Sequence, residues 1–261
     1  EKWGPIRKVA AILDAHVTRK NKKKEGTGKD NPLMAGFPNH SINKHVDKLL
    51  AASYTVVIVT QDSHGSANPE REVSAIYSPG TNLEFNKTYD SNYLACIYIE
   101  PFTFLQARTQ TGLSIGFSIV DVSTGENKLY ETSSKVDDIM YSLDEIYRMI
   151  QFYKPQEVLL YVPKDVVIPD ESKHPTDNSL GMDQDALIRI FELKKSTYYF
   201  CSHNTKDSKK LYQAEVLNRA FTNSTKLSIF EYLNLEQYDV SLKSYICLLQ
   251  FAYEHNEMII Q

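Results

Sequence analysis

Three strand-like segments follow one another in the middle of the chain, and they constrain its fold more than any other feature. They read YLACIYI over residues 93–99, LSIGFSIVDVS over 113–123 and ENKLYET over 126–132. Segments this rich in β-branched and aromatic residues are typical of strands. The tetrapeptide STGE joins the second segment to the third with turn chemistry. The pattern therefore predicts an antiparallel meander.

Alternating helical and strand patterns follow the meander. Residues 135–151 repeat apolar side chains at helical spacing, and these are Val136, Ile139, Met140, Leu143, Ile146, Tyr147 and Ile150. The short apolar run EVLLYVP predicts a buried strand, and the polar tract 163–183 predicts an exposed excursion. The remaining segments predict a helix at 183–194, the strand TYYFCS, and helices at 208–220 and 239–255. This order predicts a mixed sheet covered by helices on both faces.

The N-terminal part carries a separate α/β pattern. A helix is predicted from Pro5 that turns to strand near AHVTR, and a polar, lysine-rich tract from Lys20 to Asn31 predicts a mobile loop. A second helix begins near Ser41 or Asn43, either of which can cap it. It repeats apolar residues on one face, namely Ile42, Val46, Leu49 and Leu50. TVVIVTQ predicts a buried strand, and REVSAIYSPGT predicts a second one closed by a Pro-Gly turn.

Length and composition indicate a folded protein of two domains. The chain has 261 residues, of which 42% are apolar and 24% charged. Its three cysteines lie far apart in apolar runs, which predicts buried free thiols in a reducing compartment. No signal-like core or apolar run of about 18 residues occurs, which predicts an intracellular protein without a membrane span. Cytoplasm, nucleus and mitochondrion are not distinguished.

Charge is segregated along the chain. Residues 1–50 contain eleven Lys and Arg against five Asp and Glu, whereas the other 211 residues carry a net charge of −10. A basic region on an acidic body predicts a polyanion contact confined to the N-terminal part. The alternative is a charged loop that is only solvated.

Few residues suggest catalysis. No closely spaced glycines lead into a helix with Lys-Ser/Thr, so the chain is expected neither to hydrolyse ATP nor to hold a cofactor. His40 and His45 are five residues apart and do not share a helical face, which argues against a metal site. Asp121 ends a strand, where two-metal nucleases keep a carboxylate, but Glu126 is its only acidic neighbour in sequence. A metal-dependent nuclease of ribonuclease H type is thus an alternative, and an exposed hairpin aspartate is the preferred interpretation.

The candidate binding residues lie in the basic part. Lysines before a loop can reach successive phosphates, and the turn MAGFPNH offers residue types that press on a minor groove or donate to phosphates. Taken alone, Met34 and Phe37 are residue types that more often belong to the core. The DNA-binding candidates are Arg19, Lys20, Lys22, Lys23, Lys24, Met34, Pro38, Asn39 and His40.

Several of these stretches resemble one protein family. The order of ILDAHVTRK, a variable basic loop, NPLMAGFPNHSINKHVDKLLAASYTVVIVTQ and REVSAIYSPGT is similar to the mismatch-recognition domain of the MutS family of DNA mismatch repair proteins. The later GLSIGFSIVDVSTGE, QEVLLY and YICLLQFAYE resemble the connector domain of that family. The resemblance implies a small mixed α/β recognition domain over residues 1–81, a linker over 82–92, and a ribonuclease H-like three-layer α/β/α connector over 93–261.

The resemblance also implies a function. It implies binding of double-stranded DNA with mismatches or small loops, in a homodimer or heterodimer whose full-length subunits use ATP and Mg. The phenylalanine-x-glutamate motif that reads the mispair does not occur in this sequence, so the chain resembles a fragment cut after that motif and before the clamp, lever and ATPase domains. The connector would contact a MutL-type protein. A pure protein-interaction module is the remaining alternative.

Overall fold

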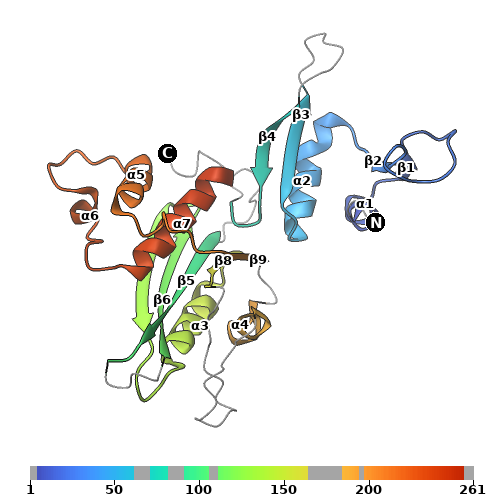
Figure 1. Cartoon of the computed structure of the whole chain (residues 1–261). Coiled ribbons are helices and arrows are strands. Elements are labelled where there is room, and N and C mark those ends of the chain that lie inside the picture. The colour runs from blue at the N-terminus through green and yellow to red at the C-terminus, as the bar shows by residue number, and fades with distance from the viewer. Residues whose placement is uncertain are drawn as a thin grey trace. The chain divides into compact units, whose positions relative to one another are not determined.

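The chain folds into two compact units, Glu1–Lys87 and Thr88–Gln261 (Figure 1). The computed structural model describes residues 5–61, 71–81, 91–105, 111–163, 184–193 and 197–255. Within these ranges, no helix combines the length and apolar character that crossing a membrane requires. The mixed α/β class predicted from the sequence is confirmed in both units.

The described residues of unit 1 form two α-helices, a 3₁₀ turn and two small antiparallel sheets. Its elements are α1 (Ile6–Leu13), β1 (Val17–Arg19), β2 (Leu33–Ala35), the 3₁₀ turn η1 (Asn39–Ser41), α2 (Ile42–Ala51), β3 (Val56–Gln61) and β4 (Arg71–Tyr77). β1 pairs with β2, and β3 pairs with β4. Val46 and Leu50 of α2 pack on residues of the β3–β4 ribbon, as the one-sided apolar pattern of this helix predicts.

Two local predictions for unit 1 were wrong. The strand predicted as buried is β3, but Val57 and Val59 are 51% and 53% exposed, because a helix covers only one face of the two-stranded ribbon. Ser41 precedes α2 without capping it. Its hydroxyl instead donates to the Pro38 carbonyl oxygen at 2.7 Å, and the 3₁₀ turn leads the chain into the helix.

Unit 2 is built on one five-stranded sheet. Its elements are β5 (Tyr93–Thr103), β6 (Thr111–Asp121), β7 (Glu126–Ser133), α3 (Tyr141–Tyr153), β8 (Glu157–Tyr161), α4 (Gln184–Ile190), β9 (Thr197–Cys201), α5 (Lys210–Ala220), α6 (Ile229–Tyr232) and α7 (Val240–His255). The strand order is β7-β6-β5-β8-β9. β5, β6 and β7 form the predicted antiparallel meander, and β8 and β9 add in parallel.

Helices cover both faces of this sheet. Alternate side chains of its strands point to opposite sides, and both sets are apolar, so each face needs a cover. Leu94 and Cys96 of β5 join a core with α5 and α7, whereas Ala95 and Ile97 join a second core with α3 and α4 (Figure 1). α7 lies close to β6 at Gly116, where a Cβ atom would meet the Val240 carbonyl oxygen at 2.2 Å. The sheet therefore has two buried faces, as predicted.

Some boundaries in unit 2 differ from the sequence prediction. The helix predicted from residue 135 begins at Tyr141, because Lys135 and Asp138 exchange backbone hydrogen bonds in a turn before it. The short helix α6 was not predicted, although Ser228 and Glu231 form a complete capping box at its start. Nearly all of the predicted excursion, residues 164–183, lies outside the described residues. The three cysteines are free, as predicted; Cys96 and Cys247 are buried and Cys201 is half-buried.

Candidate nucleic-acid interface

The basic loop of unit 1 spans the two strands of the β1–β2 sheet. Arg19 pairs with Leu33 at the end of the ladder, and the Lys20 N–H donates to the Pro32 carbonyl oxygen at 3.0 Å. The strands are only three residues long, so the loop between them is longer than the sheet that supports it. Such a loop needs contacts of its own to keep one shape.

A buried asparagine supplies those contacts. Asn31 is 3% exposed, and its side-chain oxygen accepts a hydrogen bond from the Asn21 N–H at 2.8 Å. Its side-chain nitrogen donates to the carbonyl oxygens of Lys24 at 3.1 Å and Gly26 at 3.0 Å. Gly26 has φ of +82°, a conformation that suits glycine. The loop predicted as mobile therefore has a defined hydrogen-bonded shape.

The lysines of this loop point into solvent. Lys20, Lys22, Lys23 and Lys24 are all exposed, and so is Arg19 at the end of β1. Within the described ranges, no ion pair engages any of these five cations. Arg19 also donates to the Lys24 carbonyl oxygen at 3.3 Å. The structure thus brings the five predicted cations together on one hydrogen-bonded loop and its supporting strand.

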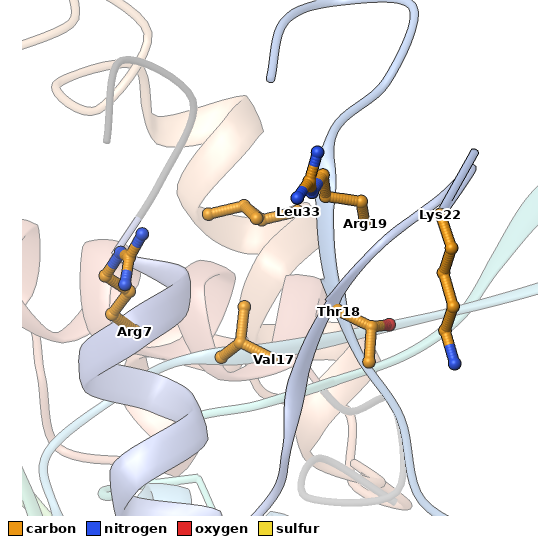
Figure 2. A pocket seen from close by; sticks show the side chains of 6 residues that line it. All are labelled: Arg7, Val17, Thr18, Arg19, Lys22 and Leu33. Atoms are coloured by element: carbon orange, nitrogen blue, oxygen red, sulfur yellow. The ribbon is translucent and has the colours of Figure 1, made fainter. Parts of the chain in front are cut away.

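A cleft of about 300 Å³ lies beside the loop (Figure 2). Arg7 rises from α1 on one side, and Val17 and Leu33 lie between it and Arg19, while Lys22 extends beside Thr18 (Figure 2). No acidic side chain belongs to this lining. The cleft therefore combines three cations from different parts of the sequence with an apolar floor.

The predicted turn residues form a second exposed segment. Pro38, Asn39 and His40 are exposed at the start of η1. The ring of Phe37 lies 4.1 Å from the ring of His45 on α2, and this contact anchors the turn to the helix. Phe37 remains 38% exposed, so it is partly buried and is not a core residue.

Met34 is separated from Arg19 within the β1–β2 sheet. Met34 pairs with Thr18, whereas Arg19 pairs with Leu33 one position along the ladder. Neighbouring positions of a strand face opposite sides of a sheet. Met34 is 48% exposed, which excludes the core alternative that its residue type allows. The predicted site residues thus occupy two faces of the sheet rather than one patch.

Sequence reasoning missed Arg7 and Asn31. Arg7 was assigned only to a helix, and no local signal connects it with Arg19, which is twelve positions away. Asn31 stands directly before a proline at the end of the basic tract, a place typical of turn residues. That signal could have identified Asn31 as a structural residue of the loop.

Asp121 of unit 2 is only 3% exposed, so the prediction of an exposed hairpin aspartate was wrong, and its carboxylate is turned inward to hold a turn. Its carboxylate accepts hydrogen bonds from the Ser123 hydroxyl at 2.6 Å, the Ser123 N–H at 3.0 Å and the Asn92 N–H at 3.2 Å. Burial favours a raised pKa, but these hydrogen bonds outweigh it and hold the pKa of Asp121 below its usual value. Glu126, its partner across the hairpin, forms an ion pair with Lys128. Among the described residues, no three His, Cys, Asp or Glu side chains converge as a metal site would require.

Comparisons with known proteins match both the basic unit and the chain as a whole. Residues 7–86 match the sequence model of MutS domain I. A DNA mismatch repair protein MutS homologue of Acanthamoeba polyphaga mimivirus is 28% identical in an alignment that covers 98% of this chain. The chain is thus similar to MutS proteins, over residues 7–86 in the domain I model and over nearly its whole length in the mimivirus relative. DNA mismatch repair protein MutS of Halothermothrix orenii is 35% identical over 59% of the chain, and that of Streptococcus thermophilus is 32% identical over 63%.

The MutS match contains the whole described interface. The cleft, the lysine loop and the turn at Pro38 all lie within the stretch that matches domain I. The alignments span 23% of the mimivirus relative and 15% of the Halothermothrix orenii protein. The chain is therefore much shorter than the curated MutS proteins that it matches.

Proposed function

We propose that this chain binds mismatched double-stranded DNA in mismatch repair, as part of a MutS-type protein. One observation carries the proposal: five exposed cations, from Arg19 to Lys24, are held on a loop whose shape Asn31 fixes. A preordered loop loses little conformational freedom on binding. Its lysines can contact successive phosphates without reading base sequence.

Mismatch recognition is supported by the names of the relatives and by the exposed turn. The three relatives described above are DNA mismatch repair proteins by name. A mispair lowers the cost of unstacking and bending a duplex, so a protein can select it through deformability. Met34, Pro38, Asn39 and His40 are the exposed residues that would approach the groove, while the lysines hold the backbone.

Unit 2 would serve as the connector. Its strand order β7-β6-β5-β8-β9, with an antiparallel meander followed by parallel strands, supports a ribonuclease H-like assignment. We expect it to contact protein, including a MutL-type partner, because the acidic balance beyond residue 50 disfavours a DNA surface. Dimerisation and the use of ATP and Mg would belong to regions of the full-length protein beyond this chain. The chain itself is proposed to be non-enzymatic.

Fluorescence anisotropy of the full chain with a short duplex, across a salt series, tests the proposal. We expect weak binding with a slope of log K against log salt of roughly −3 to −5, set by that number of phosphate contacts. Changing Lys20, Lys22, Lys23 and Lys24 to Gln should flatten the slope. A matched control removes the same charge from exposed lysines of unit 2, namely Lys206, Lys209, Lys210 and Lys226.

Comparison of matched and singly mismatched duplexes completes this test. We expect little preference, because the chain lacks the phenylalanine-x-glutamate motif. A clear preference would show that residues within 31–40 read the lesion themselves. Absence of binding at low salt, or equal loss in the loop variant and the unit 2 control, would contradict the proposal and favour a protein-interaction module.

A further inference from the structure

The cleft in Figure 2 is lined by cations that do not all belong to the lysine loop. Arg7 comes from α1, Arg19 from β1 and Lys22 from the start of the loop, yet all three line one cleft. Cations that gather without a counter-charge repel one another. Within the described ranges no acidic side chain forms an ion pair with any of them, so none there offsets this repulsion.

The start of α1 adds to this positive potential. Pro5 occupies the N-cap position with no side-chain hydrogen bond, and the first turn contains no acidic residue. The first turn instead contains Arg7 and Lys8. A helix N-terminus carries a partial positive charge and favours anions, so two cations at this end are unfavourable without an anion nearby.

We propose that this cleft binds one backbone phosphate of the DNA, with Arg7 and Arg19 as its ligands and Lys22 as a further positive charge at its edge. This inference rests on the proposed function and extends it to a residue of α1. Guanidinium groups pair with phosphate oxygens in a two-pronged geometry, and lysine adds a point charge. The floor of Val17 and Leu33 excludes part of the water around the bound anion, which strengthens these contacts.

The lining favours a phosphate over a base. None of the six lining residues is aromatic, so a flipped base would find no stacking partner. None carries a carboxylate or amide that could read a base edge, and the Thr18 hydroxyl is the one neutral polar side chain among them. A volume of about 300 Å³ suits a phosphate with part of its sugar. The contact should therefore be independent of sequence.

Three variants of the full chain test the inference in the anisotropy assay. Arg7→Gln removes a ligand, Lys22→Gln removes the charge at the edge of the cleft, and Arg7→Gln/Lys22→Gln removes both. Lys8→Gln is the matched control, because Lys8 is exposed in the same turn of α1 but does not line the cleft. Arg19 is left intact because it also bonds the Lys24 carbonyl oxygen.

We expect Arg7→Gln to weaken binding by about tenfold, the size of a lost charged hydrogen bond. The double variant should flatten the salt slope by about 0.9, the value of one phosphate contact on B-DNA. Matched and mismatched duplexes should lose affinity by the same factor. Lys8→Gln should leave the slope close to that of the unaltered chain.

The outcomes separate this inference from the proposed function. If the unaltered chain binds DNA through its lysine loop but Arg7→Gln behaves like Lys8→Gln, the phosphate cleft is wrong and the proposed function stands. If the unaltered chain does not bind at all, both are wrong. A second readout is the NMR shift of the Nε–H groups of Arg7 and Arg19 on addition of duplex, which should move for a bound phosphate and stay fixed otherwise.

Discussion

The side-chain nitrogen of Asn31 donates to the Lys24 carbonyl oxygen at 3.1 Å and so ties the centre of the basic loop to its end. Asn31 is buried, whereas Lys24 is exposed. The hydrogen bond uses the backbone of Lys24 and leaves its ammonium group in solvent. The loop thus gains a fixed shape without losing a cation, which separates the residue that shapes the interface from those that bind.

Asn31→Asp should unfold the loop locally, because a carboxylate would face the carbonyl oxygens of Lys24 and Gly26 where the amide now donates. We expect a cost of about 1–3 kcal/mol per unsatisfied group. Faster amide hydrogen exchange between residues 21 and 26 would measure it. Asn21→Asp is the control, since it adds the same charge but keeps the acceptor for the Lys23 N–H. Equal exchange in both variants would contradict the role of Asn31.

Gly116→Ala should destabilise unit 2. The added Cβ would lie 2.2 Å from the Val240 carbonyl oxygen and 2.5 Å from the Ser241 nitrogen, so the start of α7 must move away from β6. Overpacking of this kind costs about 1–3 kcal/mol. Urea unfolding followed by circular dichroism should show a lower midpoint. Gly28→Ala, where nothing lies within 4 Å of the added atom, should leave it nearly unchanged.

Glu131→Ala should weaken the same contact between β7 and α7. One carboxylate oxygen of Glu131 accepts hydrogen bonds from the N–H groups of Val240 and Ser241, each at 2.9 Å, at the start of the helix. Loss of such a cap costs about 0.5–2 kcal/mol. Glu131→Gln keeps an acceptor without the charge, so its urea midpoint should fall between those of the unaltered chain and Glu131→Ala. A midpoint for Glu131→Ala equal to that of the unaltered chain would contradict this role.

Periodic patterns predicted most elements of the fold. The apolar face of α2 and the β-branched segments of the meander depend on local spacing, which the structure preserves. Burial was predicted less well, because Val57 and Val59 look like core residues until the number of strands and covering helices is known. The start of α3 was also missed, since the apolar spacing continues backwards through a turn.

The site was predicted as a set of residue types but not as a geometry. The cations of the loop follow directly from the sequence, as does the exposed turn at Pro38. The hydrogen bond from the Asn21 N–H to Asn31 and the approach of Arg7 to Arg19 join positions ten and twelve residues apart. Contacts at such separations depend on how α1 and the β1–β2 sheet pack, which no local pattern specifies.

Asp121→Asn should lower the stability of unit 2 in a pH-dependent way. The hydrogen bonds from Ser123 and Asn92, acting against burial, hold the folded-state pKa of Asp121 below its unfolded value of about 3.9. The charged form therefore contributes stability above that value, and the contribution is lost as pH falls through the folded-state pKa. Urea midpoints of the unaltered chain and the variant should differ at pH 7 and converge as the pH falls below the folded-state pKa of Asp121. A difference that stays constant with pH would contradict this, and magnesium-dependent DNA cleavage abolished by the same variant would support the nuclease alternative.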